Sequence, residues 1–470
     1  MKSTILYICL FLVSSVNVFA QLDRSVKPEP GPAPEIKIAD YESFELPNGL
    51  KVFVVENHKL PKVTFSLVLD RDPVMEENKA GYLSITGELL RTGTKTRSKA
   101  QLDEEIDFIG AYLSTSSTGI AGSSLKKHTE KLLELMSDVL LNPSFPQEEM
   151  DKIKKQTLSA LALAKDDPNS IANNVSRVLV YGKNHPYGEI TTEETVKNIT
   201  IQDSKNYYEK FFRPNIAYLA IVGDITKKEA EGLVKKYFGK WKKGDVPKFE
   251  YKDPELPEKR IVALVDRAQS VQSVIEIAHP LKLKPGEPEV IKSRLLNEIM
   301  GGSFTSRLNM NLREKHGYTY GARSSISSDE LIGNFSASAK VRNEVTDSAI
   351  AEMLKEINLL GKEKVKAEEL QNAKNYITGS FARSMENPQT VASFAINTAR
   401  YNLPKDYYAN YLKNVDKVTI EDVQEMAKRF VKPEHSYIIL VGKAEEVGKN
   451  LNNYGEVKHY DIYGNLIDQK

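Results

Sequence analysis

An internal repeat is the feature that most constrains how this chain can fold. Thr200-Ile-Gln-Asp203 and Thr419-Ile-Glu-Asp422 lie 219 residues apart, and further identical residues follow both copies at the same spacing without a gap. The matching pairs are Phe211 and Phe430, Pro214 and Pro433, Tyr218 and Tyr437, Val222 and Val441, and Gly223 and Gly442. Shared identities, and not only a shared periodicity, indicate that one structural unit has been duplicated.

Each copy predicts the same local structure: a capped helix, a proline turn and a buried strand at residues 218–222 or 437–441. Both halves of the chain also open with alternating apolar residues, and helical spacing follows. These strand-like openings cover residues 50–55, 63–69, 260–265 and 271–277. We therefore expect an α+β fold of two homologous lobes, each a mixed or antiparallel sheet backed by helices.

Composition shifts along the chain predict its division into segments. We expect the first lobe at residues 41–240 and the second at 259–455, joined by a charged, proline-rich linker at 241–258, with a tail at 456–470. Residues 1–20 have the basic start, apolar run and small residues of a signal peptide, and a proline-rich spacer follows at 21–40.

The N-terminal segment also indicates the cellular compartment of the protein. Its apolar run, residues 5–18, is shorter than the roughly 20 residues that span a membrane, so we expect cleavage rather than insertion. The only cysteine, Cys9, would leave with it. The remaining chain, without thiols, could function in an oxidising compartment without disulfides. The formal net charge of +1 provides no long-range attraction to nucleic acid.

Several short motifs, taken in order, resemble the pitrilysin-type (M16) metallopeptidases over about residues 41–445. These relatives include the α-type subunits of the mitochondrial processing peptidase and the core subunits of the cytochrome bc1 complex. The motifs are Pro47-Asn-Gly-Leu-Lys-Val52, Lys79-Ala-Gly81 with Gly93-Thr94, Asp166-Asp-Pro168, His185-Pro-Tyr-Gly188 and Val222-Gly-Asp224. The resemblance implies the duplicated fold and a peptidase-related role.

The zinc site that this resemblance implies is degenerate. Active members carry His-x-x-Glu-His on the helix between the Gly81 and Gly93 positions, where two His and a distant Glu bind zinc and the inner Glu is the base. The matching positions hold Ser84, Gly87 and Glu88, and the distant position holds Ala160. We expect this chain to bind no metal and to need no cofactor of its own.

No replacement site is evident in the sequence. None of the seven histidines stands three or four residues from another, as a helical zinc pair requires. Ser84 and Glu88 could share a helix face, but a serine nucleophile needs a neighbouring base, and none is near in sequence. Gly87 is expected to weaken its helix by roughly 1 kcal/mol relative to alanine.

The second lobe retains a different part of the family pattern. Residues 300–320 predict a glycine turn, a helix from about Thr305 to His316, a left-handed stop at Gly317 and a returning strand. In the family this stretch supplies an Arg and a Tyr that bind the peptide near the scissile bond. The resemblance assigns these roles to Arg313 and Tyr320, with Tyr318 as an alternative on the same strand face. A surface ion pair and interface packing would explain the same residues.

Residues 110–122 form a small, polar stretch where relatives present an edge strand that pairs with substrate backbone. Leu113, Ser114 and Thr115 would line it, although an ordinary exposed edge strand would have the same composition.

Together these features predict a non-catalytic, substrate-binding subunit of a heteromeric zinc peptidase in the periplasm of a Gram-negative bacterium. The partner chain would carry His-x-x-Glu-His and supply both zinc and base, and an extended peptide would be the substrate. One alternative is a structural or peptide-holding protein with no role in hydrolysis. Another is a self-sufficient hydrolase with an unrecognised site.

Overall fold

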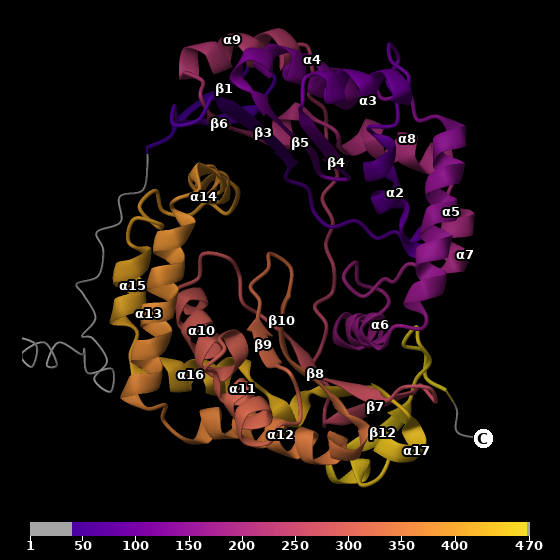
Figure 1. The fold of residues 1–470 in the computed structure, drawn as a ribbon, viewed down its shortest axis with the longest axis vertical. Coiled ribbons are helices and arrows are strands. Elements are labelled where there is room, and N and C mark those ends of the chain that lie inside the picture. The colour runs from indigo at the N-terminus through magenta and orange to yellow at the C-terminus, as the bar shows by residue number, and fades with distance from the viewer. Residues whose placement is uncertain (1–39, 468–470) are drawn as a thin grey trace, which may run out of the picture. The chain divides into compact units, whose positions relative to one another are not determined.

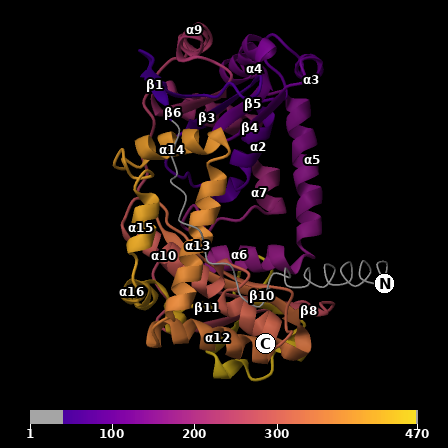
Figure 2. The same ribbon diagram turned by 60° about the vertical axis from the view of Figure 1, so that its left-hand side comes forward.

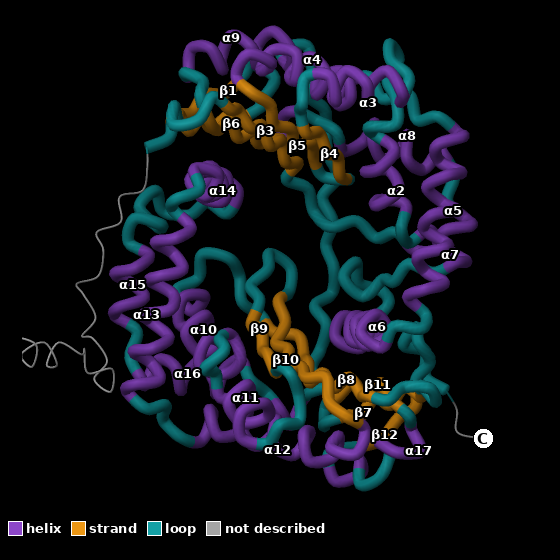
Figure 3. Tube along the Cα trace, viewed as in Figure 1, coloured by secondary structure: helices purple, strands orange, loops and turns teal. Residues whose placement is uncertain are grey.

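The computed structural model describes residues 40–467, so the predicted signal peptide and almost all of the proline-rich spacer lie outside the described residues. Within that range the strands form two six-stranded sheets, each backed by helices (Figures 1 and 3). This confirms the predicted α+β fold of two repeated lobes.

The first sheet has the strand order β1-β2-β6-β3-β5-β4. Its strands are β1 (Glu42–Glu45), β2 (Lys51–Glu56), β3 (Lys62–Leu69), β4 (Tyr112–Ser116), β5 (Gly119–Leu125) and β6 (Ala217–Gly223). β2 and β6 pair in parallel, and the remaining pairs are antiparallel. The predicted strands at residues 50–55, 63–69 and 218–222 are therefore confirmed.

Strict alternation places one face of β3 in the core. Val63, Phe65, Leu67 and Leu69 are buried, while the residues between them are half-buried. Helices pack on this buried face and complete the first core (Figure 1). The helices of this lobe are α2 (Tyr82–Leu89), α3 (Lys99–Phe108), α4 (Thr129–Leu141), α5 (Gln147–Ala164), α6 (Pro168–Tyr181), α7 (Glu193–Asn198), α8 (Ile201–Phe211) and α9 (Lys227–Phe238).

The second sheet repeats the arrangement with the order β12-β7-β11-β8-β10-β9. Its strands are β7 (Ile261–Asp266), β8 (Gln272–Leu281), β9 (Ala322–Ile326), β10 (Gly333–Arg342), β11 (Tyr437–Gly442) and β12 (Glu456–His459). The expected tail at 456–470 is thus partly wrong. β12 pairs in parallel with β7, and Tyr460 is buried beside it.

All helices of the second lobe except α14 contribute to its core with one face of this sheet. The helices of this lobe are α10 (Glu289–Asn297), α11 (Arg307–Asn309), α12 (Thr346–Lys362), α13 (Ala367–Ser384), α14 (Pro388–Arg400), α15 (Tyr411–Lys417), α16 (Ile420–Phe430) and α17 (Ala444–Val447). The repeated motif begins α8 and α16 in the same way. Thr200 N donates to Asp203 Oδ2 at 2.8 Å, and Thr419 N donates to Asp422 Oδ2 at 2.9 Å.

Each lobe contributes one helix that packs on the sheet of the other lobe. α6 belongs to the first lobe by sequence but packs on β8 and β11, where Ile171 and Val175 join a buried cluster with Ile439. α14 belongs to the second lobe but packs on β2 and β6 (Figure 2), and its Ala392 shares a buried cluster with Val55. Each helix begins in the same way, with Asp or Asn at the N-cap and Pro at the first position.

Polar contacts join the lobes beside these helices. Tyr187, from the His-Pro-Tyr-Gly motif, donates to Asp329 Oδ1 at 2.7 Å. Arg400, at the end of α14, bonds to Asp70 of the first lobe at 2.8 Å and to Glu330 of the second at 3.1 Å. The His-Pro-Tyr-Gly motif therefore links the two halves of the chain, a role that the sequence alone does not indicate.

The boundary of the first lobe at residue 240 is also too early. Trp241 is buried in the core of that lobe, and Phe249 packs partly against it. The backbone N–H of Phe249 donates to Asp72 Oδ2 at 2.9 Å. The first half of the expected linker therefore lies against the first lobe. Among the described helices, none is both long and apolar enough to cross a membrane.

Candidate functional site

Helix α2 carries the three positions that correspond to the zinc motif. It begins after Gly81, which adopts a left-handed conformation with φ of 105°. The carboxylate of Glu76 accepts hydrogen bonds from the N–H groups of Gly81 and Leu83, both at 2.9 Å, and so caps the helix. Ser84 and Glu88, one turn apart, are both exposed. Reduced hydration raises the pKa of the Glu88 carboxyl, although the side chain still reaches solvent.

Gly87 has a structural role that the sequence did not reveal. It is buried, and a Cβ atom at this position would lie 2.5 Å from the Ser117 nitrogen and 2.7 Å from the Ser116 carbonyl carbon. Thr115 Oγ1 donates to the Gly87 carbonyl at 2.7 Å. Helix α2 therefore approaches the β4–β5 hairpin too closely for any side chain at residue 87. The glutamate that acts as base in active relatives does not fit here.

The distant ligand position does not compensate. Ala160 is exposed on α5, a helix that packs beside α2. Across residues 40–467, no three His, Cys, Asp or Glu side chains lie close enough together to hold a metal ion. The side chains at the four degenerate positions thus do not suit zinc.

The second lobe repeats the glycine contact of the first. Residues 298–302 form a π-helical turn after α10, which corrects the predicted glycine turn at this point. A Cβ atom at Gly301 would lie 2.3 Å from the Ser324 nitrogen of edge strand β9. Gly87 and Gly301 thus occupy equivalent places, each where a helix meets the edge strand of its own sheet. Helix α2 is therefore as close to β4 as the π-helical turn of the second lobe is to β9.

The predicted clamp residue Arg313 lies in a π-helical segment, residues 310–315, that continues α11. Its guanidinium lies 4.5 Å from the centre of the Phe304 ring, and its Nε is 3.4 Å from a carboxylate oxygen of Glu314. The side chain is 37% exposed, so its donors reach solvent. The expected helix from Thr305 begins slightly later, because Ser306 is its N-cap.

The two candidate tyrosines differ in exposure. Tyr320 is 93% exposed, whereas Tyr318 is half-buried and stacks on His316 with 4.9 Å between ring centres. Gly317 has a φ of 62°, as the predicted left-handed stop requires. The returning strand begins only at Ala322, so both tyrosines lie in the preceding loop and do not share a strand face. Of the two, Tyr320 is free to contact another molecule.

Only the first part of the predicted peptide-pairing stretch, β4, is a sheet edge, because its second part enters β5, which lies between β3 and β4. Its side chains differ from the prediction. Leu113 is buried in the core, and Thr115 bonds to α2, so neither side chain lines an open surface. Ser114, half-buried, points to the other face by the period of two. Only the backbone of this edge and Ser114 remain suited to pairing with a peptide.

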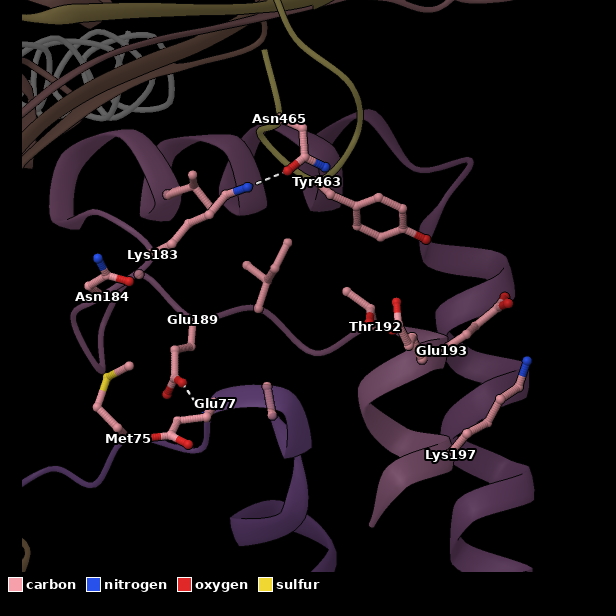
Figure 4. Close-up of a pocket in the computed structure, with 15 residues that line it drawn as sticks. Met75, Glu77, Lys183, Asn184, Glu189, Thr192, Glu193, Lys197, Tyr463 and Asn465 are labelled. Atoms are coloured by element: carbon pink, nitrogen blue, oxygen red, sulfur yellow. Dashed lines mark hydrogen bonds between the residues drawn. The ribbon is translucent and has the colours of Figure 1, made fainter. Parts of the chain in front are cut away.

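A pocket of about 660 Å³ lies beside the end of α6, and three of its charged side chains have structural partners (Figure 4). Glu189 accepts from the backbone N–H groups of Glu76, at 2.8 Å, and Glu77. Lys183 bonds to Asn465, and Glu193 pairs with Lys165 at 2.7 Å. None of the site residues predicted from the sequence lines this pocket.

Comparison with known proteins establishes the relationship. A family model described as Insulinase (Peptidase family M16) matches residues 51–186, and one described as Peptidase M16 inactive domain matches residues 198–377. The chain belongs to peptidase family M16. Between them the two M16 models cover most of both lobes, and the second match runs from the end of the first lobe into the second.

Individual M16 proteins resemble the chain over most of its length. A protein of Helicobacter pylori named non-peptidase homolog YmxG is 24% identical over 81% of this chain and 89% of its own. A protein of Bacillus subtilis named uncharacterized zinc protease YmxG is 23% identical, over 74% and 85%. A Pseudomonas fluorescens structure described as a peptidase M16 inactive domain superposes with a TM-score of 0.78 at 23% identity, covering 86% of this chain and 98% of its own.

Proposed function

We propose that this protein is the non-catalytic, substrate-binding subunit of a heteromeric zinc-dependent M16 peptidase. The observation that supports the proposal is an asymmetry between the lobes. The first lobe has lost the zinc ligands and packs a glycine where the base would stand. The second lobe keeps Arg313 and an exposed Tyr320.

The chemistry of these two side chains suits peptide binding. A guanidinium and a phenol both donate hydrogen bonds, and both can bind a peptide carbonyl and the oxyanion that develops from it. The distance from Arg313 Nε to the Glu314 carboxylate is 3.4 Å, longer than a charge-assisted hydrogen bond. The guanidinium can therefore still bind a peptide. Residues on the partner chain would hold the zinc and the general base, and the reaction would take place there.

The cellular compartment of the protein is also part of the proposal. The signal-peptide pattern of residues 1–20 favours export, and we place the protein in the periplasm of a Gram-negative bacterium. The alternative of a structural or peptide-holding protein remains a competing outcome of the test. It agrees with the name of the Helicobacter pylori relative, a non-peptidase homolog.

The test combines this chain with an M16 chain of the same organism that carries His-x-x-Glu-His. Peptide cleavage by the mixture is then measured with Arg313→Ala and Tyr320→Phe. We expect a loss in kcat/KM of about 100-fold for the arginine variant and less for the phenol, as for other lost oxyanion donors. Arg383→Ala and Tyr376→Phe are matched controls, because both residues are exposed in the same lobe. Equal cleavage by all four variants would contradict the proposal.

A further inference from the structure

A buried asparagine connects the two segments that carry the exposed clamp. Asn309, at the end of α11, is only 4% exposed. Its Nδ2 donates to the Phe304 carbonyl at 2.6 Å, and its Oδ1 accepts from the Ala322 N–H at 3.3 Å. One amide group therefore links the segment before α11 to the segment that enters β9.

Each of these segments carries one half of the clamp. The Phe304 ring lies 4.5 Å from the Arg313 guanidinium, so the segment that Asn309 holds also orients this arginine. Ala322 stands two residues after Tyr320. On either side of Tyr320, Thr319 Oγ1 donates to the Gly321 carbonyl at 2.9 Å and accepts from its N–H at 3.1 Å, which shapes the turn that presents the tyrosine.

We propose that Asn309 is a positioning residue for peptide binding, which fixes the distance between Arg313 and Tyr320 while remaining out of contact with the peptide. This rests on the proposed function, because it assumes that these two side chains bind the substrate. The reason for such a residue lies in the exposed tyrosine. A phenol that is 93% exposed has almost no packing of its own, so its place depends on the backbone that carries it.

Loss of the Asn309 amide would weaken peptide binding indirectly, because the segments that carry Arg313 and Tyr320 would be less ordered. Without Asn309, the Phe304 carbonyl and the Ala322 N–H would lose their partner, and the two segments could move apart. A peptide would then have to order them as it binds, which lowers affinity without removing any direct contact. We expect Asn309→Ala to weaken peptide binding about tenfold, about the value of one hydrogen bond.

The experiment measures binding of a fluorescein-labelled decapeptide, the tightest binder from a random library, to the full chain by fluorescence anisotropy. Asn309→Leu accompanies the alanine variant, because it removes the same bonds while leaving less of a cavity. Asn343→Ala is the matched control for stability. Asn343 is also 4% exposed, and it donates to the Ser270 carbonyl at 2.7 Å and to Glu446 Oε2 at 2.8 Å.

A double-mutant cycle separates positioning from a general loss of stability. In a Tyr320→Ala background, Asn309→Ala should cost less than about threefold in affinity, because one of the groups that it positions is gone. Asn343→Ala should leave affinity unchanged in both backgrounds while lowering the melting temperature.

The outcomes distinguish the two claims. If Tyr320→Ala weakens binding but Asn309→Ala does not, or if their effects simply multiply, Asn309 has no positioning role and the proposed function stands. If no library peptide binds, or if Arg313→Ala and Tyr320→Ala both bind like the wild type, the proposed function fails and the positioning role fails with it.

Discussion

Replacing Gly87 by alanine tests whether the degenerate zinc helix is held by its contact with the β4–β5 hairpin. In an unconstrained helix this change stabilises by about 1 kcal/mol, since glycine is the poorer helix former. Here the new Cβ would lie 2.5 Å from the Ser117 nitrogen and 2.7 Å from the Ser116 carbonyl carbon. Both atoms belong to the backbone, so the helix or the hairpin must move.

Overpacking of this kind costs roughly 1–3 kcal/mol, and contacts this short with backbone belong at the upper end of that range. After the helix-propensity gain is subtracted, we expect Gly87→Ala to lower the free energy of unfolding by about 1–2 kcal/mol. Gly232→Ala is the control in the same lobe. Gly232 lies within α9, and a Cβ there would meet nothing within 4 Å. That variant should be stabilised by about 1 kcal/mol.

The assay is urea unfolding followed by tryptophan fluorescence. Trp241 is the only tryptophan of the chain, and it is buried in the core of the first lobe, so its emission reports on the lobe that contains both glycines. If Gly87→Ala is as stable as Gly232→Ala, helix α2 is not held against the hairpin as the structure has it. The steric argument against a catalytic glutamate would then be wrong.

The remaining predictions concern the metal site and the pH dependence of stability. The combined variant S84H/G87E/E88H/A160E should bind no stoichiometric zinc in equilibrium dialysis, because residue 87 has no room for the glutamate. For the same reason it should unfold at a lower urea concentration than the wild type. Stoichiometric zinc in a folded protein would refute this. Burial lowers the pKa of His279 from 6.5 to about 4, and both of its ring nitrogens bond to backbone groups. The folded state therefore binds fewer protons than the unfolded state between these two values, and the stability should fall by about 3 kcal/mol as the pH drops from 6.5 to 4. Circular dichroism of wild type and His279→Gln across this range checks the prediction, since the variant should lose the slope, and an equal slope in both would contradict it.

The repeated core could be predicted from the sequence because its signals are local. The capping pairs Thr200–Asp203 and Thr419–Asp422 start α8 and α16, and period-two alternation marks β3. Identities at a constant spacing then linked the two halves.

Features set by tertiary contacts could not be predicted in this way. The amphipathic pattern of α6 shows that one face is buried, but not that it covers the sheet of the other lobe. Gly87 was interpreted as a weak point in a helix, because the hairpin that approaches it is remote in sequence. β12 is short and charged, and pairing with β7 determines its conformation more than its own propensity does.

The candidate site contains features that the sequence predicts and features that only the structure shows. The degenerate zinc positions could be identified from motif positions, and the assignment of Arg313 and Tyr320, which stays a prediction, rests on motif positions as well. The π-helical segment at 310–315 and the late start of β9 could not, because π-helical geometry has no distinct sequence pattern. As a result, the sequence placed Tyr318 and Tyr320 on one strand, whereas the structure separates a half-buried ring from an exposed one.

We propose that this chain completes the peptidase activity of another M16 chain. The most direct measurement is peptide cleavage by the purified His-x-x-Glu-His partner at fixed zinc concentration, with and without an equimolar amount of this chain. We expect the pair to cleave much faster than the partner alone, a chelator to abolish that activity, and this chain alone to be inactive. Equal cleavage with and without this chain, or chelator-insensitive cleavage by this chain alone, would contradict the account.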